Sequence, residues 1–362
     1  MMRNAIEHQL CRMHGRSYCL LVGNGTAGLT LCLEALALHG KRVAIPDSVC
    51  ISVPLAVLYS ENIPAYIDVE IDNLGPSITE LESSSADLDA VIAVHGYGAI
   101  CRIGEIESIA KKHRLPLIED ACLVQGGHVD GRPTGSFGLA SVVSFGIGKP
   151  ITLGHGGAIL TDDLHLYRTI KSLDERLPLF SEKAYQSIDA LGKHHTRLYN
   201  EHYSSDLEQH VELFQQMALE SRQHFMHRFN DSILPRLKAG LDYLPREIDL
   251  RWIHWEKLSQ ALYKTLDDRI QIFSLPSGSV PWRLNILMNK DKRDTAMHTL
   301  HKRGLNASSW HPPVSKFFHA TSIVNNTPVA HKIGEKILNL WVTDYSDQYT
   351  NAVCETLNSI EA

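Results

Sequence analysis

The sequence lacks the features that mark several classes of protein. It contains no run of 18 apolar residues, and the opening residues 1–7 have no apolar core of the kind a signal peptide needs. The seven cysteines are scattered, odd in number and never spaced as CxxC, which indicates reduced thiols and not a disulfide framework. These absences predict a cytoplasmic protein without a membrane-spanning segment.

The sequence also lacks clusters of one charge sign and clusters of metal-binding residues. The chain carries 35 Lys and Arg residues against 41 Asp and Glu, a net charge of −6, and no basic patch that would suggest nucleic acid. Its 20 histidines are dispersed, without the spacing of a ligand set, so we expect no metal site. A hydrophobic content of 44% with 21% charged residues is typical of a folded globular protein.

Segments with strand and helix patterns alternate through the first 163 residues. Strands are predicted at 18–22, 42–46, 63–68, 89–94, 115–120, 140–144 and 158–161, and helices at 3–14, 29–38, 52–59, 77–83 and 103–113. Such alternation predicts an α/β fold with a mostly parallel central sheet and right-handed crossovers. Further helices are expected between 165 and 240.

The residue composition and pattern change after Gly240. Tryptophan, proline and glycine punctuate the next 40 residues, followed by a predicted strand at 282–288 and a helix at 294–303 that Gly304 ends. Because 362 residues exceed what one core usually holds, we predict a large α/β domain over 1–240 and a small α+β domain over 241–362.

A lysine at the end of a glycine-rich turn is the main candidate for a catalytic residue. Ser144-Phe-Gly-Ile-Gly-Lys149 follows a predicted strand and precedes Gly154-His-Gly-Gly and a second strand. Between two buried strands such an amine is partly desolvated, which favours its nucleophilic form, although an exposed turn lysine is the plainer interpretation. Upstream, strand 115–120 delivers Asp120 at its carboxyl end, where open α/β sheets bind ligands.

A second glycine-rich turn, Gly23-Asn-Gly-Thr-Ala-Gly28, joins a strand to a helix. Free N–H groups and the helix dipole make such a turn a cradle for an anion. It also matches the GxGxxG dinucleotide fingerprint, but the next strand ends in Pro46 before Asp47, a poor fit to the ribose-binding acid. A phosphate site, a dinucleotide site and a structural turn all stay open.

Together these groups match what pyridoxal phosphate (PLP) requires. Backbone donors at 25–28 and the Ser144 hydroxyl suit its phosphate, the Asp120 carboxylate suits its ring nitrogen, and the Lys149 amine suits its aldehyde and can shuttle a proton. Plainer roles remain: Asp120 can bind loop amides at the strand end, and Ser144 can be satisfied within a buried strand.

The chain also resembles the DegT/DnrJ/EryC1/StrS aminotransferases. The similarity is carried by Asn24-Gly-Thr-Ala-Gly-Leu29, Val94-His-Gly-Tyr-Gly98, Ile118-Glu-Asp-Ala-Cys122 and the segments 144–149 and 154–158. It runs almost without gaps over residues 18–163 and returns faintly at 310–314 and 337–340. These are fold type I PLP enzymes. Most aminate keto groups on nucleotide-linked sugars or cyclitols with glutamate or glutamine, as dimers with the active site at the interface.

The resemblance implies a role for each matching residue. Lys149 becomes the Schiff-base and proton-transfer residue, and Asp120 the partner of the pyridinium nitrogen. The phosphate would be held by the backbone of the segment Gly25, Thr26 and Ala27 and by the Ser144 hydroxyl.

Three positions depart from the family pattern. Leu123 stands where the family has Gln or His near the cofactor's phenolic oxygen, which makes Gln125 a candidate substitute. Cys50 replaces an aromatic residue that stacks on the ring in many members. The segment by which a partner subunit donates an asparagine is faint, and Asn200 is either that residue or a helix-terminus residue.

Two further features leave alternatives open. The histidine-rich stretch from Gly192 to His202 either faces an atypical acceptor or is a solvated helix face. Arg283 either holds the carboxylate of an amino donor by its bidentate fork or is structural.

The sequence therefore predicts a homodimeric fold type I aminotransferase that moves an amino group from glutamate or glutamine to a keto acceptor. Two PLP-based alternatives remain: elimination, decarboxylation or condensation on an amino-acid-derived substrate, and a PLP-binding regulator without turnover. A dinucleotide-dependent oxidoreductase rests on 23–28 alone and leaves Lys149 unexplained.

Overall fold

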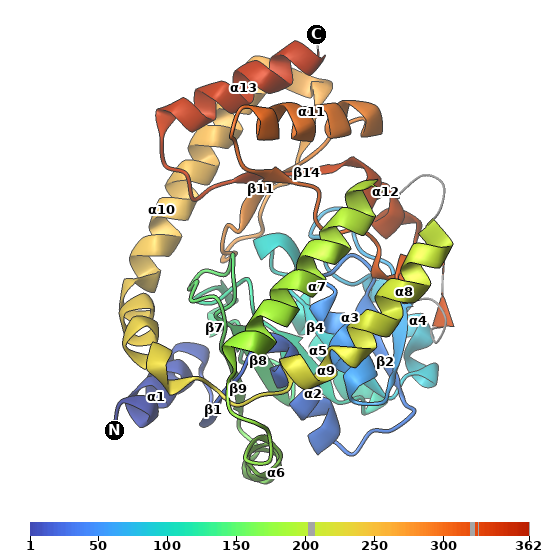
Figure 1. The fold of residues 1–362 in the computed structure, drawn as a ribbon, viewed down its shortest axis with the longest axis vertical. Helices are drawn as coiled ribbons and strands as arrows, with labels where there is room; N and C mark the ends of the chain where they lie inside the picture. Colours follow the sequence, from blue (N-terminus) through green and yellow to red (C-terminus); the bar gives the residue numbers. More distant parts are fainter. Residues whose placement is uncertain (202–206, 319–322, 325, 362) are drawn as a thin grey trace.

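The structure is a computed structural model that describes residues 1–201, 207–318, 323–324 and 326–361. Figure 1 shows an α/β layer that holds the large sheet and, above it, a smaller layer in which α11 and α13 cover a second sheet. Among the described residues, no helix has the length and apolar character needed to cross a membrane.

The large sheet has eight strands in the order β1-β9-β8-β5-β4-β2-β3-β13. Its pairs from β8 to β13 are parallel, whereas β9 runs antiparallel to both β1 and β8. The strands are β1 (Tyr18–Val22), β2 (Arg42–Pro46), β3 (Ile63–Ile67), β4 (Ala90–Val94), β5 (Leu117–Asp120), β8 (Ala140–Ser144), β9 (Gly157–Thr161) and β13 (Ile323–Val324). The predicted mostly parallel sheet is confirmed.

Helices cover both faces of this sheet. The first face packs against α2 (Gly25–Ala35), α3 (Ser52–Tyr59), α6 (Leu164–Asp174), α7 (Glu182–Glu201) and α8 (Leu207–Glu220). The other packs against α1 (Met2–His14), α4 (Ile78–Ser84), α5 (Ile103–His113) and the start of α10 (Leu234–Leu266). The alternation of strand side chains explains the division: Leu20 and Val22 enter the first core, and Cys19 and Leu21 the second.

Helix α2 begins earlier than its apolar pattern predicts. It starts at Gly25 and not at residue 29, because the Asn24 side chain accepts the Ala27 N–H at 2.8 Å and caps the helix. It ends at Ala35, and Ala37 has a φ of 53° that no α-helix continues through. The glycine-rich turn is therefore the first turn of the helix.

Helix α10 joins the two layers. Its first half places Leu237 and Leu241 in the core of the large sheet, and its second half places Leu258 and Leu262 in the core of the small sheet. Figure 1 shows it running along one side of the molecule. Residue 240 thus lies inside a continuous helix, and the division of the chain at that residue stays a prediction.

The small sheet is antiparallel, in the order β10-β11-β14-β12. Its strands are β10 (Gln271–Ile272), β11 (Arg283–Leu287), β12 (Ala307–Ser308) and β14 (Ile337–Trp341), with α11 (Lys290–Lys302) and α13 (Asp347–Glu361) packed on it. The remaining elements are the hairpin β6 (His128–Val129) and β7 (Arg132–Pro133), with α9 (Arg222–Phe225) and α12 (Pro328–Lys336).

Candidate active site

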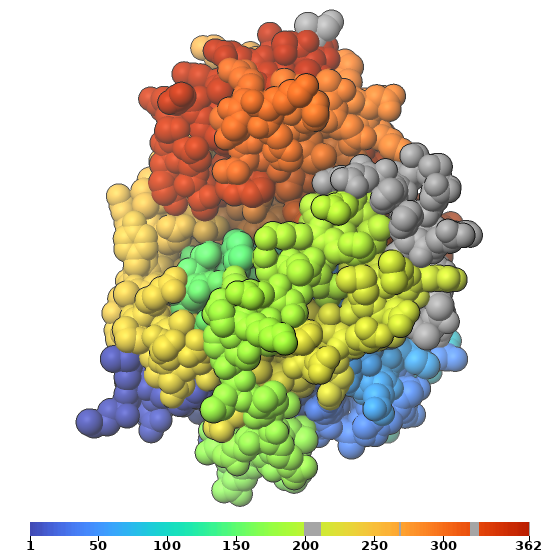
Figure 2. All heavy atoms as spheres, in the orientation of Figure 1, coloured from blue at the N-terminus to red at the C-terminus, as the bar shows by residue number. Residues whose placement is uncertain are grey.

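A cavity of about 430 Å³ and another of about 630 Å³ are present. The larger lies at the carboxyl ends of β4, β5 and β8, lined by Val94, Asp120 and Ser144. Its other walls come from the start of α2, the Lys149 loop, α7 and segments of the small layer at 282–283 and 310–311. Figure 2 shows α7 and α8 at the front of the molecule, below the small layer. Parallel sheets bind ligands at this edge.

The amino end of α2 forms one end of this cavity. The first N–H groups of a helix have no partner within it, and those of Gly25 and Thr26 belong to residues that line the cavity. Ala27 differs from the prediction because its N–H is taken by Asn24. A carbon added to Gly25 would lie 3.2 Å from Ser144 Cβ and 3.4 Å from Cys122 Sγ, so the helix end, β8 and the loop after β5 meet here.

Asp120 and Ser144 stand where the sequence places them. Asp120 is the last residue of β5, 8% exposed, and its carboxylate accepts the Cys122 N–H at 3.0 Å. Ser144 is the last residue of β8, and its hydroxyl accepts the Gly146 N–H at 3.2 Å. Both line the cavity. Each keeps further hydrogen-bonding capacity for a ligand.

Lys149 is half-buried and lines the same cavity. Its carbonyl accepts the Thr152 hydroxyl at 2.7 Å, and the carbonyl of Gly148 accepts the indole N–H of Trp282 at 3.0 Å. Within the described part of the chain, the Lys149 ammonium makes no hydrogen bond or ion pair. The amine is therefore available to a bound molecule.

Two other predicted residues are not brought to this cavity. Gln125 is fully buried and donates to the Ser144 carbonyl at 2.8 Å, so it supports β8 from behind and is not among the lining residues. Asn200 lies in α7, and its side chain falls outside the described residues, as does His202.

The residues that depart from the family pattern do line the cavity. Leu123 and Cys50 are both in its wall, so an apolar side chain and a thiol replace the expected polar and aromatic contacts. Cys122 also lines the cavity, a position that was not predicted from the sequence. Burial raises the pKa of the Cys122 thiol well above its ordinary value, and the Asp120 carboxylate adds to the effect, so the thiol stays protonated.

Aromatic side chains form a further part of the cavity wall. His195 on α7 is 1% exposed, stacks on Trp310 at 5.4 Å and meets the edge of Phe317 at 4.6 Å. Burial lowers the pKa of His195 to about 3, so the imidazole is neutral. A solvated helix face is therefore wrong for His195, although Lys193 beside it is exposed.

His311 and Trp282 complete this wall. His311 lies in the segment 310–314, where the family resemblance returns faintly and from which the sequence predicts a residue that can reach the site, whereas no such prediction is made for Trp282. Their rings are nearly parallel, 9° apart, with centroids at 6.0 Å. Burial lowers the pKa of His311 to about 3, and the nearby positive charge of Lys149 contributes. They arrive from the small layer, more than 130 residues after Lys149, and no local pattern marks Trp282.

Arg283 is a buried cation in the cavity wall. It is 8% exposed, its guanidinium lies 4.4 Å from the Trp282 ring centre, and its Nη1 donates to the Ser308 hydroxyl at 3.4 Å. Burial lowers the pKa of Arg283 to about 9, so it remains charged at neutral pH. The guanidinium also lies over the Trp341 ring, 2.9 Å from its centre, and no carboxylate among the described residues pairs with it.

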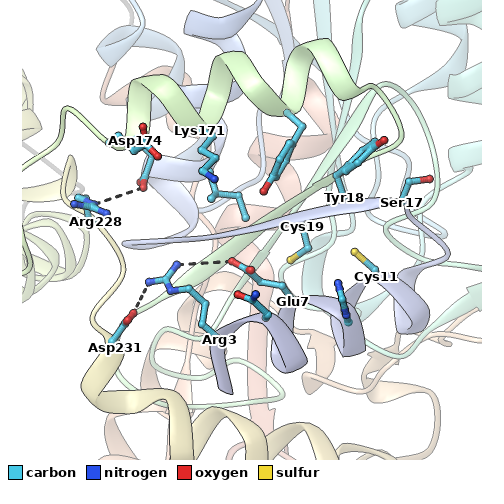
Figure 3. Close-up of a pocket in the computed structure, with 15 residues that line it drawn as sticks. Arg3, Glu7, Cys11, Ser17, Tyr18, Cys19, Lys171, Asp174, Arg228 and Asp231 are labelled. Atoms are coloured by element: carbon cyan, nitrogen blue, oxygen red, sulfur yellow. Dashed lines mark hydrogen bonds and ion pairs between the residues drawn. The ribbon is translucent and has the colours of Figure 1, made fainter. Parts of the chain in front are cut away.

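The smaller cavity lies apart, between α1, β1 and α6 (Figure 3). Its charges largely satisfy one another: Arg3 pairs with Glu7 and Asp231, and Arg228 lies 3.9 Å from Asp174. None of the predicted site residues lines it. The larger cavity is therefore the candidate active site.

Relatives of known activity align with less than half of the chain. L-glutamine:scyllo-inosose aminotransferase of Streptomyces griseus is 36% identical over 152 residues, 41% of this chain and 36% of the relative. GDP-perosamine synthase of Escherichia coli O157:H7 is 32% identical over 163 residues, 44% of this chain and 45% of the relative. The chain thus matches less than half the length of these relatives.

Solved structures match over nearly the whole chain. A DegT/DnrJ/EryC1/StrS aminotransferase from Brucella abortus superposes with a TM-score of 0.75 at 20% identity, and the match covers 100% of this chain and 90% of the Brucella chain. TlmJ from Streptoalloteichus hindustanus gives 0.79 at 20% identity, covering 99% and 90%. The predicted fold type I architecture is confirmed. The profile of the DegT/DnrJ/EryC1/StrS aminotransferase family matches residues 2–358, and the chain belongs to that family.

Proposed function

We propose that this protein is a PLP-dependent aminotransferase that moves an amino group from an amino-acid donor, glutamate or glutamine, to the keto group of a sugar or cyclitol. The observation that carries the proposal is the meeting of Lys149, Asp120, Ser144 and the amino end of α2 in one cavity. Family membership and the activities of the aligned relatives support the same reaction class.

The residues present fit PLP. The N–H groups of Gly25 and Thr26 and the Ser144 hydroxyl would hold its phosphate, in a cradle that a carbon on Gly25 would narrow. The Asp120 carboxylate would accept a hydrogen bond from the protonated ring nitrogen. Lys149 is left as the amine that binds the cofactor covalently. When bound, the cofactor supplies an aldehyde for amines and a ring that withdraws electrons from the substrate carbon.

The chain's own residues divide the remaining tasks. The Lys149 amine, when it is not bound to the cofactor, would act as the base and acid that moves a proton at the reacting substrate carbon. The buried Asp120 side chain would face the ring nitrogen and favour its protonated form. Buried Leu123 and Cys122 exclude water beside these groups.

Arg283 is suited to the donor. Its guanidinium is the buried cation of the wall that lacks a described carboxylate partner, and a donor carboxylate would satisfy its fork. The neutral imidazole of His311 beside Lys149 and the neutral wall at His195 add no charge. An uncharged polyhydroxylated acceptor suits these surroundings.

Two parts of the proposal go beyond one chain. We place the active site at the interface of a homodimer, with Asn200 as the candidate contribution to the partner's phosphate site. The cytoplasmic location stays a prediction from the sequence.

The test is an absorbance spectrum of the protein with PLP, before and after L-glutamate or L-glutamine is added. The proposal is supported if the visible absorbance band of the bound PLP is replaced by the band of the amine form of the cofactor when the donor is added. Lys149→Ala should abolish this change and all turnover. Lys171→Ala, at the separate cavity, is the matched control and should behave as wild type. A persistent band would favour the non-transaminating PLP alternatives, and an active Lys149→Ala variant would exclude the assignment.

A further inference from the structure

One side chain from outside the loop that carries Lys149 donates a hydrogen bond to the turn just before this residue. The indole N–H of Trp282 donates to the carbonyl oxygen of Gly148 at 3.0 Å. Gly148 has a φ of 75° and directly precedes Lys149, so its peptide group fixes the direction in which the Lys149 backbone leaves. Over the described residues, this is the one hydrogen bond that reaches 147–149 from beyond the loop and its two flanking strands.

Trp282 is itself held firmly. It is 8% exposed, its ring stacks on His311, and its edge meets the Tyr97 ring at 6.2 Å and 65°. Its backbone packs against Gly98, where an added carbon would lie 2.6 Å from the Trp282 nitrogen. The neighbouring Val280 N–H donates to the Gly98 carbonyl at 3.1 Å.

Trp282 therefore joins three parts of the molecule. It precedes β11 of the small sheet, packs on the turn η2 (Gly96–Gly98) after β4, and holds the turn before Lys149. A tryptophan side chain has two rotatable bonds and is rigid once its ring is stacked. The position of the Lys149 loop therefore depends closely on the position of the small layer. A nucleophile misplaced by about 1 Å reacts much more slowly.

We propose that Trp282 is a positioning residue that sets the orientation of the Lys149 amine through its hydrogen bond to Gly148. The inference rests on the proposed role of Lys149 as the amine that binds PLP, and extends it by making the small layer part of that amine's placement. The proposed effect of Trp282 is exerted through Gly148 and not through contact with the reacting atoms.

The experiment measures the covalent reaction of Lys149 directly. The protein is freed of cofactor and incubated with PLP, so that an amine and the aldehyde condense with loss of one water. Borohydride then reduces the C=N bond at timed intervals, and peptide mass spectrometry gives the labelled fraction at each lysine. The variant is Trp282→Phe, which keeps an aromatic ring and removes the donor.

Trp252→Phe is the matched control. The Trp252 indole N–H also donates to a backbone carbonyl, that of Ser279 at 3.2 Å, but away from the Lys149 loop. We expect Trp282→Phe to label Lys149 about tenfold more slowly than wild type, with other lysines unchanged, whereas Trp252→Phe labels it at the wild-type rate. Thermal midpoints of the cofactor-free proteins show that both variants are folded.

The outcomes separate the two claims. If wild type is labelled at Lys149 and Trp282→Phe at the same rate, Trp282 is only structural and the inference fails. If wild type is not labelled at Lys149, the proposed function fails instead. Should Trp282→Phe not fold, Trp282→Leu removes the same donor without supplying another, and the same comparison of labelling rates decides.

Discussion

Gly25 lies directly against the side chain of Ser144, where helix α2 begins and strand β8 ends. A carbon added to Gly25 would lie 3.2 Å from Ser144 Cβ, closer than most such contacts, and 3.4 Å from Cys122 Sγ. Neither neighbour can withdraw easily, because both are buried in the sheet edge. The absence of a side chain at residue 25 therefore keeps the cradle open.

Gly25→Ala should weaken PLP binding by about tenfold while leaving the protein as stable as wild type. The added methyl narrows the cradle between α2 and Ser144, whereas alanine is better than glycine within a helix by about 1 kcal/mol. A PLP titration followed by absorbance gives the affinity, and thermal unfolding without cofactor gives the stability.

Gly104→Ala is the control for this substitution. Gly104 also lies in the first turn of a helix, α5, but a carbon added there meets no atom within 4 Å. Its PLP affinity should equal that of wild type. Equal affinity in Gly25→Ala as well would contradict the placement of the phosphate between α2 and β8.

The strand-end part of the site follows from the sequence because it obeys a general rule. Asp120 and Ser144 end adjacent parallel strands, and adjacent parallel strands end at the same edge. The bounds of α2 could not be derived from apolar spacing, because the Asn24 cap and not a hydrophobic residue sets its start. Capping patterns should have shifted the predicted start to Gly25.

The aromatic wall could not be predicted in the same way. Trp282 and His311 reach Lys149 only because the small layer packs on η2, a contact between segments almost 200 residues apart. Gln125 shows that a residue close to the site in the sequence can still have its side chain outside the cavity. It was a candidate substitute two residues beyond Leu123, the position at which the family contacts the cofactor, but its side chain donates to the Ser144 carbonyl behind β8.

Two cysteines can report which cavity binds the cofactor. Cys50 and Cys11 are both half-buried, and the other five cysteines are buried. Cys50 lines the candidate active site, and Cys11 lines the smaller cavity shown in Figure 3. PLP should therefore slow the alkylation of Cys50 by iodoacetamide at least about tenfold and leave Cys11 unchanged, as measured by peptide mass spectrometry over time.

Pyridoxal without the phosphate is the control ligand. It cannot use the N–H groups of α2, so at equal concentration it should protect Cys50 less than PLP does. Protection of Cys11 but not Cys50 would place the cofactor in the smaller cavity and overturn the site described here.

His195 makes the stability of the protein depend on pH. Its imidazole is 1% exposed and packed against Trp310 and Phe317, and burial lowers its pKa in the folded protein to about 3. In the unfolded chain a histidine has a pKa of about 6.5. Between these values the unfolded chain binds a proton that the folded protein does not, so the stability contributed at neutral pH is lost as pH falls below about 6.5.

His195→Phe should remove this loss, because phenylalanine suits the same aromatic wall and does not titrate. The difference in free energy of unfolding, variant minus wild type, should be about 2–3 kcal/mol larger at pH 4.5 than at pH 8, because only wild type loses stability at the lower pH. Urea unfolding at both pH values measures the difference, and His298→Gln, at an exposed position on α11, should show almost none. If wild type and His195→Phe lose stability in parallel from pH 8 to 4.5, then His195 is protonated in the folded protein and the wall it forms is open to water.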